Sequence, residues 1–180
     1  TISGCRASYG GAIHVESSEL MLNHAILEDN IALPLCYDID GTVNCEDDLF
    51  VQGGNGGCLH VHRADATVDT SRLHGCTALS GGAIMAQSGS EIVLRSSNVT
   101  SSRTYVQQGS VAIFVYGLPH GRGAVAALHA THLVLQLAEL RDNRAASDGH
   151  LFFFSAKRPE MSKLVTLNAE REANLNNEVI

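Results

Sequence analysis

Short runs of alternating apolar and polar residues recur along the chain, separated by Gly, Ser, Asn and Asp. Residues 10–15 read Gly-Gly-Ala-Ile-His-Val, and residues 56–61 and 81–86 repeat this pattern. Side chains alternate between the two faces of a β-strand, so Ile13 and Val15 share one face. The pattern predicts a series of short strands, each with one face buried.

Two degenerate copies at residues 110–115 and 148–153 extend the series, and the shortest interval, Gly57 to Gly82, is 25 residues. The first predicted inward column joins Ile13, Leu59, Ile84, Ile113 and Leu151, and its neighbour joins Val15, Val61, Ala86, Val115 and Phe153. A second core column joins Leu22, Val68, Leu94 and Leu135, and a third joins Leu27, Leu73, Val99 and Leu140.

A repeat of about 25 residues cannot bury its apolar face alone, whereas stacked repeats share one core. The chain is therefore predicted to be all-β: a right-handed parallel β-helix of about five to six coils with two loop insertions. Residues 3–11 parallel residues 74–82, so residues 1–9 are expected to be the tail of a preceding coil. A leucine-rich repeat is the alternative, but the chain lacks a regular leucine ladder.

The turns of the coils are expected to use residues that tolerate positive φ. Glycine enters this region freely, which explains the Gly pairs. Asn30 and Asn143, at equivalent coil ends, are expected to adopt the same region and to stack in a ladder.

Residues 1–180 are read as one segment of a larger protein. Residues 34–54 and 116–130 are predicted insertions, and residues 157–180 a last coil or a cap. Insertions in repeat folds form surface loops, often on the binding face.

A Gly-Gly-Ala-Ile element followed by a coil that ends in an x-x-x-Asn tetrapeptide resembles the polymorphic outer-membrane protein repeats of chlamydiae. The tetrapeptide ends at Asn30 and Asn143 here, and the resemblance covers roughly residues 4–154. It implies a pectin-lyase-like β-helix that serves as a surface stalk or adhesin passenger, outside the cell or at its surface.

Composition narrows the classes of partner. The chain is 44% hydrophobic, with 12 basic and 19 acidic residues and a net charge of −7, and it has no basic run. Nucleic-acid binding needs clustered Lys and Arg, so it is not expected. No apolar stretch approaches the ~18 residues of a membrane span, so direct membrane insertion is not expected either.

The cysteines are Cys5, Cys36, Cys45, Cys58 and Cys76, an odd number that forbids complete internal pairing. Cys36 and Cys45 flank a short polar loop, so a pairing between them is open if the compartment is oxidising. The favoured interpretation is that all five are small, half-buried thiols.

The candidate acidic chemistry lies in the first insertion, at Asp38, Asp40, Asp47 and Asp48. Glycoside hydrolysis needs two carboxylates at a set separation, and calcium needs six to eight oxygen ligands. Neither pattern is complete, so a solvated acidic loop is favoured. The Asp148-Gly149-His150 segment is interpreted as a turn before a strand.

A column of medium-sized side chains is predicted to face outward beside the Gly-Gly-Ala-Ile element: His14, His60, Met85, Phe114 and Phe152. His62 shares the face of His60, and two or three imidazoles placed in this way can ligate a transition metal. The favoured interpretation is a plain column that covers one sheet, with a second use as an exposed contact surface.

These observations favour a non-catalytic structural or adhesive β-helix that contacts other proteins or surface glycans. A carbohydrate-active enzyme or carbohydrate-binding module of the same fold is the alternative, and an intracellular scaffold is the third. Sugar clefts usually use exposed aromatic platforms, and this chain has 5% aromatic residues and no Trp. No catalytic residue and no cofactor are assigned.

Overall fold

The computed structural model describes residues 1–33, 53–104 and 132–144, and the backbone of four short strands at 126–129, 152–154, 160–162 and 166–167. All regular structure in these residues is β, every strand pair is parallel, and none of these residues belongs to a helix. Accordingly, this part of the chain contains no helix that is long and apolar enough to cross a membrane.

The strands form four parallel sheets, which we number I to IV in the order in which the chain enters them from β3. Sheet I contains β3 (Ile13–Glu16), β7 (Leu59–His62), β11 (Ile84–Gln87), β15 (Ala126–His129) and β18 (Phe152–Phe154). Sheet II contains β4 (Glu19–Asn23), β8 (Asp65–Asp69), β12 (Glu91–Arg95), β16 (His132–Gln136) and β19 (Glu160–Ser162). Sheet III contains β1 (Ile2–Ser3), β5 (Ile26–Glu28), β9 (Arg72–His74), β13 (Asn98–Thr100), β17 (Glu139–Arg141) and β20 (Thr166–Leu167). Sheet IV contains β2 (Arg6–Ala7), β6 (Ile31–Ala32), β10 (Thr77–Ala78) and β14 (Arg103–Thr104).

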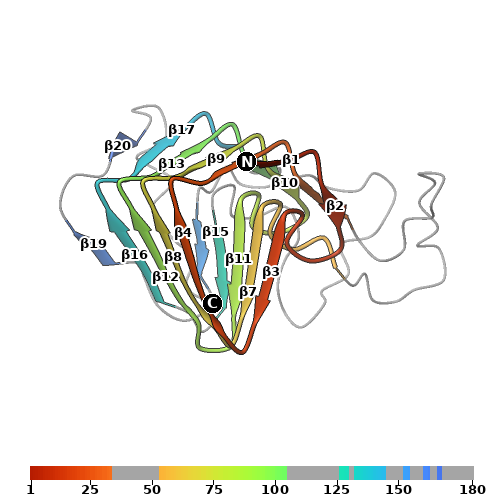
Figure 1. Cartoon of the computed structure of the whole chain (residues 1–180), viewed down its shortest axis with the longest axis horizontal. Coiled ribbons are helices and arrows are strands. Elements are labelled where there is room, and N and C mark those ends of the chain that lie inside the picture. Colours follow the sequence, from red (N-terminus) through yellow and green to blue (C-terminus); the bar gives the residue numbers. More distant parts are fainter. Residues whose placement is uncertain are drawn as a thin grey trace.

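The chain visits sheets I, II, III and IV in turn and then returns to sheet I beside its earlier strand. We call one such passage a unit: unit 1 is β3–β6, unit 2 is β7–β10 and unit 3 is β11–β14. In Figure 1, strands of successive units lie side by side, as β4, β8, β12 and β16 show. Strands β1 and β2 precede unit 1 and pair with β5 and β6, as the match between residues 3–11 and 74–82 predicts.

The predicted core columns of sheets II and III are confirmed residue by residue. Leu22 pairs with Val68, and this column continues through Leu94 to Leu135. Leu27 pairs with Leu73, and this column continues through Val99 to Leu140. Apart from Leu22, which is half-buried, all of these side chains are buried. Burial of each aliphatic side chain contributes about 1.5–3 kcal/mol, so the columns form the main stabilising feature of the stack.

In sheet I the predicted column is confirmed for three units and wrong for the next. Ile13, Leu59 and Ile84 are in register, but the partner of Ile84 is Ala126 rather than Ile113, which lies outside the described residues. The reason is chain connectivity. Two or three residues lie between the sheet I strand and the sheet II strand of each unit, and β15 stands at this distance from β16.

The predicted register of residues 151–153 is wrong by one residue. Ala126 pairs with Phe152, so Phe152 is in register with Ile84, and Phe153 is in register with Met85. A slip of one residue exchanges the two faces of a strand. The run Leu-Phe-Phe-Phe has no alternation of apolar and polar residues, so its sequence does not specify the register.

The Gly pairs satisfy two separate requirements at the corner between sheets IV and I. The first glycine of each pair has positive φ, +55° at Gly10 and +63° at Gly81. The second glycine is needed for space: a Cβ atom on Gly57 would lie 2.2 Å from the carbonyl oxygen of Gly82 in the next unit. The sequence argument from φ therefore explains only half of the motif.

The other three corners turn through residues with positive φ, usually a single residue that is not glycine; the corner between β11 and β12 has two, Ser88 and Gly89. The corner between sheets I and II uses Ser17, Arg63 and Ser88; the next uses His24, Thr70, Ser96 and Leu137; the third uses Gly4, Asp29, Gly75, Ser101 and Asp142. The expectation that Asn30 and Asn143 take positive φ is wrong, because the residue before each one does so.

The two buried asparagines stabilise the stack in a different way from the expected ladder. Asn30 Oδ1 accepts the backbone N–H of Cys5 at 2.9 Å, and its Nδ2 donates to the carbonyl of Ile2 at 3.1 Å. Asn143 binds Ser102 and Val99 of the unit before it in the same way. Units without asparagine separate the two residues, so each asparagine binds backbone rather than another asparagine.

Replacement of Gly57 by alanine tests the close approach of neighbouring units. Gly57→Ala is expected to lower the free energy of unfolding by about 3 kcal/mol or more, because the new Cβ meets backbone atoms that only a shift of the strands can move. Gly89→Ala is the control: Gly89 has a φ of +83° and open space around it, so about 1–2 kcal/mol is expected. Urea unfolding measures both, and equal losses would contradict the proposed close contact.

Candidate functional site

The first candidate site is a cluster on the outward face of sheet I, which we call the histidine cluster: Tyr9, His14, Glu16, His60, His62 and Gln87. Register brings it together, because β3 and β7 pair His14 with His60 and Glu16 with His62. The next strand places Met85 beside His60 and Gln87 beside His62. The sequence prediction that the two equivalent histidines lie on adjacent units is confirmed.

His60 lies at the centre of a hydrogen-bonded chain. Its Nδ1 is 2.8 Å from Nδ1 of His14, and its Nε2 is 3.1 Å from the Gln87 amide nitrogen. Both ring nitrogens of His60 therefore lie within hydrogen-bonding distance of a polar side chain. The His14 and His60 rings stack with centroids 4.8 Å apart, and the Tyr9 ring lies 5.2 Å from His60.

Glu16 supplies the acidic end of the cluster. One carboxylate oxygen is 3.5 Å from Nδ1 of His62, and the other is 3.9 Å from Nε2 of His14. Both imidazoles are partly exposed, and more than half of the Glu16 side chain is accessible to solvent. The Glu16 carboxylate is therefore close enough to form an ion pair with the imidazolium form of either histidine.

Burial keeps His60 neutral. Only 4% of the residue is exposed, and this desolvation, followed by the charges of His14 and His62, lowers the pKa of His60 to about 3. A neutral imidazole with both nitrogens hydrogen-bonded is a structural element at neutral pH rather than an acid or a base. No three or more His, Cys, Asp or Glu side chains within the described ranges are grouped so as to hold a metal ion.

The outward column does not form the exposed stripe that the sequence predicts. His60 and Met85 are buried, so sheet I is covered on both faces at β7 and β11. Phe152 does not belong to this column, because its register places it with Ile84. Phe114 lies outside the described residues, as do Asp38, Asp40, Asp47 and Asp48 of the first insertion and the Asp148-Gly149-His150 segment.

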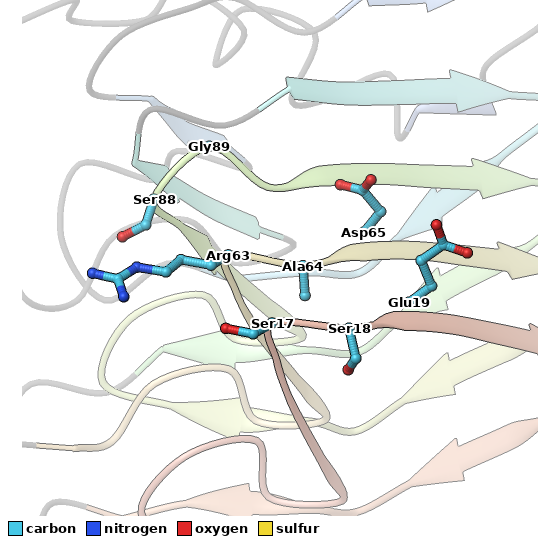
Figure 2. A pocket seen from close by; sticks show the side chains of 8 residues that line it. All are labelled: Ser17, Ser18, Glu19, Arg63, Ala64, Asp65, Ser88 and Gly89. Atoms are coloured by element: carbon cyan, nitrogen blue, oxygen red, sulfur yellow. The ribbon is translucent and has the colours of Figure 1, made fainter.

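The second candidate site is a shallow polar pocket of about 450 Å³ at the corner between sheets I and II. We call it the corner pocket; it is lined by Ser17, Ser18, Glu19, Arg63, Ala64, Asp65, Ser88 and Gly89. Figure 2 shows the Arg63 side chain extending away from the Glu19 and Asp65 carboxylates. Arg63 makes no ion pair with any residue of the described ranges.

The corner pocket follows from the repeat, although sequence reasoning missed it. Glu19, Asp65 and Glu91 are in register, so successive units place carboxylates along one edge of sheet II. Asp65 Oδ1 accepts the backbone N–H of Glu91 at 2.9 Å, which gives that carboxylate a structural role. The available signal was the acidic residue that opens each sheet II strand of units 1 to 3.

A disulfide joins Cys58 and Cys76 within unit 2, so the interpretation that all five cysteines are thiols is wrong. Both residues are fully buried. Cys58 takes the position that Ala12 and Ala83 hold in the neighbouring units, and Cys76 takes the position of Ser102. Cys5 is a free thiol, and Cys36 and Cys45 lie outside the described residues.

No protein-family model matches the chain, and no curated protein or solved structure is significantly similar to it.

The low pKa of His60 predicts that stability falls with acidification. The unfolded chain takes up a proton at His60 below about pH 6.5, whereas the folded chain does so only near pH 3. The free energy of unfolding should therefore fall by about 1.4 kcal/mol per pH unit within this window, on account of His60 alone.

His60→Met tests this prediction, because Met85 holds the equivalent position in unit 3. The free energy of unfolding, measured with urea between about pH 7 and pH 4.5, is expected to depend less steeply on pH in this variant, because the contribution of His60 is lost. Met85→Leu is the matched control for a changed side chain in the same column, and it should keep the parent slope. An unchanged slope in His60→Met would show that His60 does not cause the acid sensitivity.

Proposed function

We propose that the chain is a segment of a right-handed parallel β-helix that acts as a non-catalytic structural or adhesive rod in a secreted or cell-surface protein. The observation that carries the proposal is the in-register stacking of units: each inward column continues through successive units at the same position. A stack of this kind extends in one direction by addition of units, which suits a rod that holds other surfaces at a distance.

The order of the strands supports the coil arrangement. Each strand pairs with the strand of the same sheet in the previous unit, so one unit corresponds to one coil. Parallel strands that follow one another through a connection of this kind are right-handed in nearly all known cases, which is the basis for the proposed hand. The short corners, which turn through residues at positive φ, are consistent with such a coil.

The Cys58–Cys76 disulfide supports placement outside the reducing cytosol. Disulfides form and persist in secreted and cell-surface proteins and are rare in cytosolic ones. The resemblance of the Gly-Gly-Ala-Ile element to surface-protein repeats of chlamydiae supports the same placement. The partners that fit the proposal are other proteins or surface glycans.

A carbohydrate-binding or carbohydrate-active β-helix is the second candidate, and the corner pocket is the observation that favours it. The pocket combines serine hydroxyls, two carboxylates and a guanidinium group, which are the groups that hydrogen-bond to sugar hydroxyls. Against catalysis, Asp65 already accepts a backbone N–H, and the pocket is shallow and open.

An activity assay separates the two candidates. Incubation with polygalacturonate and with chitin oligosaccharides is expected to release no unsaturated products and no new reducing ends. Turnover that is lost in Glu19→Gln and Asp65→Asn, but kept in the exposed-site control Asn98→Gln, would overturn the proposal of a non-catalytic rod.

Loss of the disulfide tests its contribution to the rod. A double variant with Cys58→Ala and Cys76→Ser carries the residues that neighbouring units use at these positions. The bridge closes a sequence separation of 18 residues, so its removal is expected to cost about 3 kcal/mol of unfolding free energy. Cys5→Ser is the control and should have little effect. A double variant as stable as the parent in urea would contradict a stabilising bridge.

A further inference from the structure

The N-terminal end of the stack leaves part of the hydrophobic core uncovered. Strands β3 and β4 are the terminal strands of sheets I and II, so no described strand pairs with their outer edges. Three of their four inward residues, Ile13, Leu20 and Leu22, are only half-buried, and the fourth, Val15, is 7% exposed. In the next unit the equivalent residues Leu59, Ala66 and Val68 are at most 1% exposed.

The same end is already covered over the other two sheets. Strand β1 pairs with β5 in sheet III, and its Ile2 lies in register with Leu27, which is buried. Strand β2 pairs with β6 in sheet IV. The layer above unit 1 is therefore half complete: it holds the third and fourth strand positions of a unit, but not the first and second. In Figure 1 the strands β1 to β4, in the dark red to orange colours of the start of the chain, lead the four sheets at this end of the stack.

Ser18 provides a hydrogen-bond acceptor at the corner where a preceding unit would present a backbone N–H. Its register equivalent in unit 3, Ser90, accepts the backbone N–H of Ala64 in the preceding unit at 3.2 Å. Ser71 and Ser97 accept backbone N–H groups of the preceding unit in the same manner at the next corner. The exposed Ser18 hydroxyl makes no such bond within the described residues, so it is placed to accept an N–H from a unit stacked on β3 and β4.

We infer that the β3–β4 edge is an interface for one further coil of the same repeat. The occupant is a two-strand segment that pairs in parallel with β3 and β4. Its inward apolar residues lie over Ile13, Leu20 and Leu22, and its corner N–H binds Ser18. The inference rests on the coil arrangement proposed above. An added strand of the repeat would pair with the N–H and C=O groups of the β3–β4 edge. Its inward side chains would cover the half-exposed aliphatic residues.

A fusion tests the interface directly. Residues 56–71 of unit 2 supply the first two strands of a unit, and Thr1 is the register equivalent of Arg72, so a copy of 56–71 is joined to Thr1. Alanine replaces the copied Cys58 to avoid a new thiol. Hydrogen exchange at the amides of β3 and β4 is expected to slow by at least about tenfold relative to the unfused chain. Ser18→Ala in the fusion should remove part of this protection.

The matched control is the same fusion with asparagine at the copied positions of Leu59, Val61 and Val68. It keeps the added length but cannot cover the core, so β3 and β4 should exchange as in the unfused chain. Equal protection by both fusions, or none by either while β8 and β12 stay protected, would overturn the inferred interface.

Two further results are distinguishable. Rapid exchange at β8 and β12 in the unfused chain would show that the proposed stack of coils itself is wrong. Protection of β3 and β4 in the unfused chain that grows with protein concentration would show that a second copy covers this edge, and it would overturn the assignment to a further coil.

Discussion

The inward side chains of each strand are covered by the same position of the neighbouring unit, and the rest of the structure depends on this constraint. Val68 is buried between Leu22 and Leu94, and a shift of its strand by one residue would turn Val68 toward solvent. Each unit must therefore place its four strands directly over those of the previous unit. Half-burial of Leu20 and Leu22, where no described strand lies above them, shows what happens when the neighbour is missing.

The corners maintain this alignment by keeping the connections between strands short. One or two residues with positive φ turn the chain at most corners, and the glycine pairs stand where a side chain would meet the backbone of its own unit or of the next one. Buried corner groups are then satisfied between units. Ser97 Oγ accepts the N–H of Ser71 and lies within hydrogen-bonding distance of the Val68 carbonyl, and Asn143 bonds to Ser102 and Val99. Because buried polar groups cost free energy when unpaired, these side chains also favour one register over its alternatives.

The sequence predicts the columns well where the repeat is regular and poorly where its pattern is lost. The Leu22 and Leu27 columns follow from alternation and spacing alone. The register of Phe152 does not, because three consecutive phenylalanines give both faces the same character. The pairing of Cys58 with Cys76 and the burial of His60 depend on contacts across a unit and on what covers sheet I, which spacing along the chain does not encode. The corner pocket likewise arises from register rather than from a local motif.

Cysteine cross-linking across sheet II tests the central claim of in-register parallel stacking most directly. Thr67 and Val93 are outward-facing partners on neighbouring strands, and Val134 lies one strand further on. Neighbouring parallel strands are about 4.8 Å apart, within the range of a disulfide, and strands two apart are beyond it. In a Cys5→Ser background, mild oxidation should join Thr67→Cys to Val93→Cys, and Thr67→Cys should remain unjoined to Val134→Cys, as read by mass spectrometry of the linked peptides. Cross-linking of the second pair as fast as the first, or of neither pair in the folded chain, would contradict the stacked register.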